Sequence, residues 1–277
     1  NYLGGVTQIT QSTSRVIIDW TGFDTTSGQV VQFSQQQGAN SIALNRISGP
    51  ATSFQGTLQA NGRVILVNNN GFHVNGATMN VYGGLTISTN GLSSASTTDF
   101  IAGGTNFNFD QSGAINAKVR VTNTSITVDP GREVILQGPQ VELNGAIITA
   151  EGGDIVVAAG NKFQVAISPT GDDLISYEVT DPAVAAGIAN AAIQIDRSIL
   201  NASNPLGNGG NVLISADVMN SVYDNVIAIT ATSGLTAIRA DSNLQSGANG
   251  GTITVKAKAN GGTINNNAIL ISGGDGV

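Results

Sequence analysis

The chain of 277 residues contains no cysteine. Disulfide bonds are therefore excluded, and so is any metal site built from cysteine thiolates. A protein of this size without covalent cross-links must be stabilised by its apolar core and its backbone hydrogen bonds.

Charged residues are scarce, at 10% of the chain, and 18 acidic residues outnumber 11 basic ones. A net charge of −7 without a basic cluster argues against binding to nucleic acid or to an anionic membrane surface. An enzyme acting on polysaccharide needs acidic and basic side chains that converge on one outward face. Here Lys118 and Arg120, like Lys256 and Lys258, stand two residues apart, each pair on one face and without acidic partners nearby.

Histidine and long apolar runs are nearly absent as well. His73 is the one histidine, and we assign it a structural role. Asp172 and Asp173 are adjacent, so their carboxylates point apart, and we expect a solvated turn rather than an acid–base pair. No uncharged apolar run reaches the ~18 residues of a membrane span. The sequence predicts no catalytic residue, no metal site and no cofactor.

Glycine is abundant, with 36 residues, and it marks an internal repeat. The segments GGDIVVAAG, GGNVLISAD and GGTITVKAK begin at Gly152, Gly209 and Gly250. Related segments begin at Gly62, Gly83 and Gly131, which gives two gaps of 21 residues. The gaps of 57 and 41 residues after Gly152 are near three and two such periods.

A period of about twenty residues, each with short strands ended by Gly or Asn, predicts a parallel β-helix. Alternate residues should point into a narrow apolar core, as Ile155 and Val157, Val212 and Ile214, and Ile253 and Val255 do in this interpretation. A leucine-rich repeat has a similar period, but its fixed leucine and asparagine pattern is missing here. The fold class is therefore all-β.

The stretch GRVILVNNNGFHVNG, residues 62–76, holds an unusual corner. Asn-Gly between apolar runs is typical of a tight hairpin, but the chain continues at the same repeat spacing, which favours a β-helix corner. Residues 64–67 are all apolar, as in a strand that is buried on both faces. We therefore expect an element outside the helix to cover this coil.

We expect a single domain with four regions. Residues 1–40 form N-terminal cap strands, and residues 41–162 form coils with extra-helical strands. Residues 163–206 form an irregular excursion, in which the Ala-rich run 181–196 after Pro182 predicts a short helix or a departure from the coil. Residues 207–277 form further coils. Because the chain starts at Asn1 and stops within a repeat-like unit, we expect it to be the N-terminal fragment of a longer protein.

Four consecutive blocks in residues 16–90 resemble the secretion domain of two-partner-secretion exoproteins. That family shows Trp-x-x-Phe, Phe-x-Gln, Ala-Leu-Asn-Arg-Val and a Gly-x-Leu block that ends in Asn-Pro-Asn-Gly-Ile. The matching positions here are Trp20 and Phe23, Phe33 and Gln35, the stretch ALNRI at 43–47, Gly56 and Leu58, and the stretch NNNGF at 68–72. The family's proline is replaced by Asn69 and its isoleucine by Phe72.

This resemblance to filamentous haemagglutinin and the high-molecular-weight adhesins implies a right-handed parallel β-helix with an N-terminal cap and extra-helical strands. It also implies a non-enzymatic role in export from a Gram-negative bacterium, through the periplasm to the cell surface or the medium. The implied partner is an outer-membrane transporter of the Omp85 type, which recognises the domain through its periplasmic POTRA domains. We expect a monomer, with any host-surface or biofilm ligand bound by the region downstream.

The resemblance places the candidate secretion motif in two blocks, and its residues are Asn45, Arg46, Asn68, Asn69, Asn70 and Gly71. Each has a structural alternative: the asparagines can cap backbone groups at the corner, and Arg46 can pair with the N-terminal cap. Two other functions stay open at this point. One is a β-helix lyase or hydrolase acting on polysaccharide, and the other is a binder of a haem carrier.

Overall fold

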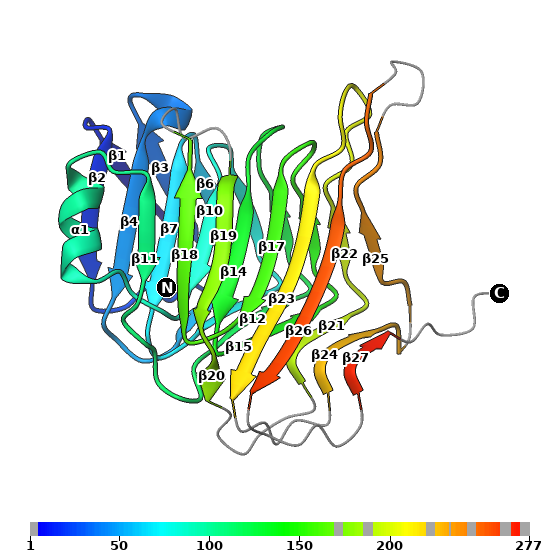
Figure 1. Ribbon diagram of the computed structural model, residues 1–277. Helices are drawn as coiled ribbons and strands as arrows, with labels where there is room; N and C mark the ends of the chain where they lie inside the picture. Colours follow the sequence, from blue (N-terminus) through cyan, green and yellow to red (C-terminus); the bar gives the residue numbers. More distant parts are fainter. Residues whose placement is uncertain are drawn as a thin grey trace.

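The computed structural model describes residues 5–168, 174–184, 191–219, 225–232, 234–242, 248–260 and 267–271. Over these residues the chain winds through three parallel β-sheets, which we name sheets A, B and C (Figure 1). Each turn of the chain adds strands to the sheets in succession, so the molecule is the parallel β-helix that the repeats predict.

Within the described residues, sheet A has eight strands. They are, in stacking order, β1 (Val6–Gln11), β3 (Val30–Gln35), β6 (Thr57–Ala60), β9 (Thr78–Val81), β13 (Ser125–Thr127), β16 (Ile147–Thr149), β22 (Ile199–Asn201) and β25 (Ala237–Arg239). A short 3-10 helix, η1 (Gly38–Asn40), follows β3.

Sheet B is the largest of the three, with nine strands among the described residues. They are β2 (Arg15–Trp20), β4 (Ile42–Ile47), β7 (Arg63–Asn68), β10 (Leu85–Ser88), β14 (Val134–Gly138), β17 (Asp154–Ala159) and β23 (Asn211–Met219), with β20 (Ala183–Val184) and β26 (Ile253–Asn260) both paired to β23. In the part of the chain that the structure describes, sheet C has seven strands, namely β5 (Thr52–Phe54), β8 (Phe72–Asn75), β12 (Lys118–Thr122), β15 (Gln140–Asn144), β21 (Ala191–Asp196), β24 (Asn225–Thr230) and β27 (Asn267–Ile271).

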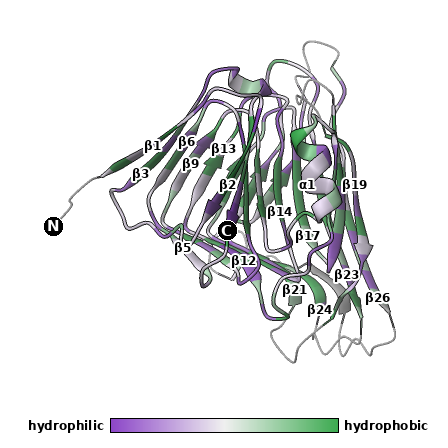
Figure 2. Cartoon of the chain, turned by 90° about the vertical axis from the view of Figure 1, so that its left-hand side faces the viewer, coloured by the Kyte–Doolittle hydropathy of each residue, from purple (hydrophilic) through white to green (hydrophobic). Residues whose placement is uncertain are grey.

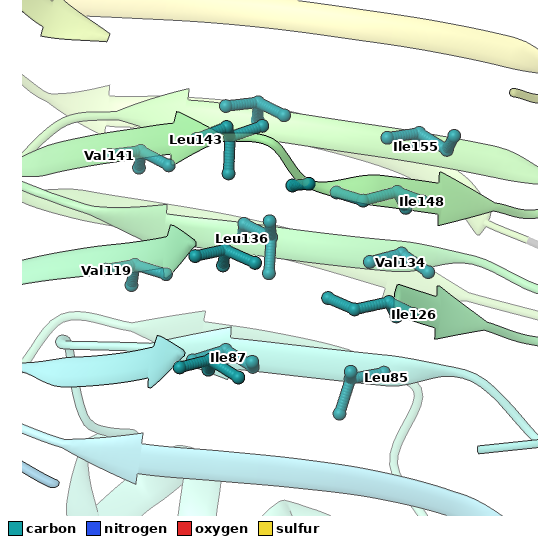
Figure 3. Close-up of a cluster of buried hydrophobic side chains, with 14 of the residues drawn as sticks. Leu85, Ile87, Val119, Ile126, Val134, Leu136, Val141, Leu143, Ile148 and Ile155 are labelled. Atoms are coloured by element: carbon teal, nitrogen blue, oxygen red, sulfur yellow. The ribbon is translucent and has the colours of Figure 1, made fainter. Parts of the chain in front are cut away.

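Equivalent positions of successive coils stack directly on one another. Val64 pairs with Leu85, Leu85 with Val134, Val134 with Ile155, and Ile155 with Val212. All five side chains are buried in one apolar core inside the helix. Figure 3 shows such rows of aliphatic side chains facing one another between the sheets. The inward alternation predicted from the sequence is confirmed for these strands.

The spacing of the later repeats was interpreted wrongly. Ile155 pairs with Val212 and Val212 pairs with Ile253, so the gaps of 57 and 41 residues are one coil each, rather than three and two. The first gap is long because it contains β18 (Lys162–Ile167) and β19 (Leu174–Asp181), which leave the helix. Ile253 is 47% exposed, although the sequence placed it in the core, because no described strand stacks beyond β26.

A second layer covers the outer face of sheet B. Strands β11 (Asn106–Phe109), β18 and β19 form an antiparallel sheet, and α1 (Ser94–Ile101) lies beside it (Figures 1 and 2). In β7, Val64 and Leu66 point into the helix core, whereas Ile65 and Val67 pack in a second apolar cluster under this layer. The expectation that an extra-helical element covers residues 64–67 is therefore confirmed.

Helix α1 is held against the N-terminal coils by a half-buried cation. The guanidinium of Arg15 lies over the rings of Phe100 and Phe107, 5.2 and 5.8 Å from their centroids. Burial lowers the pKa of Arg15, and the nearby Asp99 opposes that effect. Within the described residues, no helix has the length and apolar character needed to cross a membrane.

The second half of the expected irregular excursion is regular coil. Residues 191–196 form β21 rather than a helix, and β21 pairs in parallel with β15 and β24. Ile193 and Ile195, two residues apart, are buried in the helix core. Alternation on a stacked ladder therefore outweighs the Ala-rich composition. At the other end, β1, β2 and β3 already pair in parallel with the coils.

The glycine pairs of the repeat lie at the corner that leads into sheet B, where adjacent coils are in close contact. A Cβ atom built on Gly83, Gly210 or Gly251 would collide with the backbone of the neighbouring coil. Because adjacent coils lie only about 4.8 Å apart, side chains that point along the stacking direction have no room there. Glycine is therefore needed at these positions because the coils stack so closely.

Candidate functional site

The corner of residues 68–71 joins β7 of sheet B to β8 of sheet C. The Gly71 N–H donates to the carbonyl oxygen of Asn68 at 3.0 Å. The Asn70 N–H donates to the Asn68 side-chain oxygen at 2.9 Å, which is an Asx turn. Gly71 has φ +123°, a conformation that favours glycine. The four residues thus form the β-helix corner that the sequence predicts.

Asn68 is fully buried and ties this corner to the coil before it. Its side-chain amide donates to the carbonyl oxygen of Pro50 at 2.7 Å and to the hydroxyl of Thr52 at 2.9 Å. The exposed Asn70 donates from its side chain to the Gly49 carbonyl oxygen at 2.9 Å. Asn68 and Asn70 therefore cap backbone groups, which is the structural role expected for them.

Asn69 faces the opposite way, toward a loop of the extra-helical insertion. Its side-chain amide donates to the carbonyl oxygens of Gln111 and Ser112 at 3.4 and 3.3 Å. Its own carbonyl oxygen accepts the Ala114 N–H at 2.7 Å. This tether could not be predicted from the sequence, because its two sides lie more than forty positions apart. A proline at this position could not make the side-chain bonds.

Asn45 and Arg46 lie on β4, the strand that stacks directly beside β7. Arg46 pairs with Val67 in register, and Ile47 pairs with Asn68. The fold therefore brings the two predicted motif blocks together.

The side chains of Asn45 and Arg46 point to opposite faces of β4. Asn45 is fully buried, accepts the indole N–H of Trp20 at 3.0 Å, and donates to the Ala43 and Ile65 carbonyl oxygens. Arg46 points outward and makes two hydrogen bonds to Asp19, at 2.6 and 2.8 Å. The Arg46 partnership lowers the pKa of Asp19, and the same contact raises the pKa of Arg46.

Few atoms of the motif reach solvent. Asn45, Asn68 and Gly71 are buried, Asn69 is half-buried, and Arg46 and Asn70 are exposed. The surface that the folded corner offers to another molecule therefore consists chiefly of the guanidinium of Arg46 and the amide of Asn70.

A charged cluster lies on the outer face of sheet C, next to this corner. His73 pairs with Arg120 across β8 and β12, and Arg120 pairs with Glu142 of β15. Glu142 accepts from Lys118 at 2.5 Å and from Arg120 at 2.6 Å. The conclusion that Lys118 and Arg120 lack an acidic partner was wrong, because stacking supplies one from the next coil. Lys258 likewise contacts Asp217, at 2.9 Å.

The charges of this cluster shift two pKa values. Burial lowers the pKa of His73, and the cations Arg120 and Lys118 lower it further against a smaller opposing effect of Glu142. Burial alone would raise the pKa of Glu142, but hydrogen bonds from Arg120 and Lys118 outweigh it and lower that pKa. His73 is thus a neutral side chain beside two cations at neutral pH.

The described residues offer no candidate metal site. Within the described ranges, no three His, Cys, Asp or Glu side chains could hold a metal ion together. Asp172 and Asp173 lie outside the described residues. Trp20 packs edge-on against Phe23, with ring centroids 5.2 Å apart, and contacts the helix core, so it is a packing residue.

Comparison with known proteins agrees with this architecture. The model of the TPS secretion domain family matches residues 4–255. The structure is similar to the crystal structure of the HMW1 secretion domain from Haemophilus influenzae, with a TM-score of 0.60 and 25% identity, over 92% of this chain and 68% of that one.

Two curated relatives from Haemophilus influenzae are both named heme/hemopexin-binding protein. One is 31% identical over 198 residues, which are 69% of this chain and 21% of the relative. The other is 42% identical over 77 residues, which are 27% of this chain and 8% of the relative. The family is non-enzymatic in general, and its members are exported by Gram-negative bacteria with a partner outer-membrane transporter. The chain belongs to the TPS, or two-partner-secretion, domain family.

Proposed function

We propose that this domain is the N-terminal export signal of a large surface protein, and that POTRA domains of the partner transporter recognise it in the periplasm. We further propose that it nucleates β-helix folding of the rest of the protein outside the cell. The domain itself catalyses no reaction in this proposal and acts as a monomer.

The observation that carries the proposal is the stacking order. Each coil pairs in register with the coil that precedes it in the chain, from β4 through β7, β10, β14 and β17 to β23. A chain that emerges from a pore with its N-terminus first can therefore add one coil at a time to a folded template. A chain without cysteine also contains no covalent loop that would obstruct a narrow pore.

Recognition is assigned to the corner of residues 68–71 and to Asn45 and Arg46. Because Asn45 and Asn68 are fully buried in the folded domain, a partner can contact these side chains only before the domain folds. Arg46 and Asn70 are accessible both before and after folding. Substitutions of Asn45 and Asn68 therefore test recognition before folding, whereas substitutions of Arg46 and Asn70 also test recognition of the folded domain.

The test is export from cells that carry the partner transporter, measured beside thermal melts of purified protein. Arg46→Ala and Asn70→Ala should reduce export while the melting temperature stays nearly unchanged. Arg120→Ala is the matched control for Arg46, since both side chains are 44% exposed and paired with a carboxylate. Asn75→Ala controls for Asn70, since both asparagines are exposed. Equal export of Arg46→Ala, Asn70→Ala and Gly71→Val beside the two controls would limit the corner to a structural role.

Catalysis is tested separately on panels of uronans and other polysaccharides. No turnover is expected, because Glu142, the carboxylate of the cluster on sheet C, is held in ion pairs with Lys118 and Arg120. Reproducible cleavage that disappears on substitution of Asp172 or Asp173 would instead support a β-helix lyase or hydrolase.

A further inference from the structure

The extra-helical sheet ends in an unoccupied edge. Its strand order is β11–β18–β19, and β19 pairs with β18 on one side only among the described residues. An edge strand presents backbone N–H and C=O groups that can pair with another strand. In Figure 2, β19 lies on the same side of the molecule as β23 and β26 of sheet B.

A groove lies where the next strand of this sheet would be. It has a volume of about 540 Å³ and is bounded by β19 on one side. Outward residues of two strands of sheet B form its floor, namely Leu213, Ser215 and Asp217 of β23 and Lys256 and Lys258 of β26. The extra-helical sheet therefore stops one strand short of covering this part of sheet B.

The side chains of β19 alternate between a side that faces sheet B and a side that faces solvent. Tyr177 and Val179 of β19 pack against the apolar cluster between the extra-helical layer and sheet B, and Leu213 of β23 packs against the same cluster from the sheet B side. Ser176, Glu178 and Thr180 are exposed. A strand beside β19 would thus bury alternate side chains and leave the others in water.

The charges on the floor are uneven. Asp217 contacts Lys258 at 2.9 Å, whereas no described carboxylate pairs with the exposed Lys256. Lys256 pairs with Ser215, two residues along the strands from the pair of Leu213 and Thr254. An inward-facing carboxylate flanked by apolar residues would therefore complement this floor.

We propose that the free edge of β19 binds an extended peptide strand of another molecule, with apolar residues alternating on its inward side and an acidic residue over Lys256. The strand extends the extra-helical sheet by backbone pairing and closes the groove above β23 and β26.

A folded second copy does not fit this edge in the same orientation. If its extra-helical sheet continued this one with the apolar face downward, its own β-helix would occupy the space of β23 and β26. A single extended segment is one layer thick and meets no such obstacle. Peptide binding at β19 does not depend on the export role of the corner of residues 68–71, because that corner follows β7 and three strands of sheet B separate β7 from β23.

The test uses the full 277-residue chain and a labelled synthetic decapeptide in which Val alternates with Thr and one central inward Val is replaced by Glu. Fluorescence anisotropy should show saturable binding. A peptide with central Lys should bind about fivefold more weakly, and Lys256→Glu should reverse that preference. Arg239→Glu makes the same change of charge at an exposed site on sheet A and should leave binding unaltered.

Two further measurements locate the peptide. N-methylation of alternate peptide nitrogens should abolish binding, because it removes the backbone donors. Because the chain has no cysteine, Ser176→Cys provides one thiol beside the edge, which should form a disulfide with a cysteine-bearing peptide. Absence of saturable binding, or equal binding of the N-methylated peptide, would overturn the proposal. So would a dimer of the free protein that Lys256→Glu dissociates, since it would assign the edge to a second copy.

Discussion

Asn68→Ala separates the two roles that the corner can have. The side chain of Asn68 makes three hydrogen bonds, donating to Pro50 and Thr52 and accepting from the Asn70 N–H. At about 1 kcal/mol of net stability for each bond, the substitution should lower the free energy of unfolding by about 3 kcal/mol. That change corresponds to a decrease in melting temperature of about 6–12 °C. Asn70→Ala removes one exposed side-chain bond to Gly49 and should cost less than about 1 kcal/mol.

The assay is denaturant unfolding of both purified variants beside wild type, followed by tryptophan fluorescence. The probe is Trp20, the one tryptophan in the chain, whose indole N–H donates to Asn45 on the strand beside β7. The slope of the unfolding free energy against denaturant should stay unchanged, since both variants bury the same surface. Equal stability of the Asn68→Ala and Asn70→Ala proteins would refute the argument that Asn68 joins adjacent coils.

Three further predictions concern the corner, the stacked glycines and the charged cluster. Asn69→Pro should leave the β-helix folded but expose residues 110–117 to faster limited proteolysis, since the bonds to Gln111 and Ser112 are lost; an unchanged cleavage pattern would show that the tether is unimportant. Gly210→Ala should lower the free energy of unfolding by about 1–3 kcal/mol, because the added methyl group meets the backbone of the neighbouring coil, whereas Gly22→Ala, where no atom lies within 4 Å, should be neutral. Because the pKa of His73 is lowered on folding, stability falls as the pH drops below the ordinary value of 6.5, and the unfolding free energy of His73→Gln should depend less on pH over that range; identical pH profiles would contradict this account.

Much of the fold could be predicted from local patterns. Alternation at Ile155 and Val157 identified the inward face, and the run at residues 64–67 predicted a covering layer that the structure places over Ile65 and Val67. These predictions succeed because side-chain period and burial are properties of a single strand and its immediate neighbours.

The number of coils and the partners between coils could not be predicted in the same way. The distance between repeats in the sequence counts residues, whereas the stacking register depends on which backbones pair. The insertion of β18 and β19 therefore made one coil as long in sequence as three. Glu142 lies 24 positions after Lys118, and only the register of β12 with β15 shows that they are neighbours. The tether from Asn69 to the insertion loop is hidden for the same reason.

For the candidate motif, the sequence predicted a β-helix corner at residues 68–71 but not the exposure of each residue. Asn45 and Arg46 are adjacent, yet one is buried against Trp20 and the other is exposed beside Asp19. That distinction now determines which substitutions can test recognition of the folded domain.

The most direct test of the central claim is export of this chain by its partner. The chain, preceded by a cleavable signal peptide, is produced in a Gram-negative host with and without its partner outer-membrane transporter, and the protein in the medium is quantified. The account predicts folded, protease-resistant domain in the medium only when the transporter is present. Retention of the domain in the periplasm with a functional transporter, or equal release without one, would contradict it.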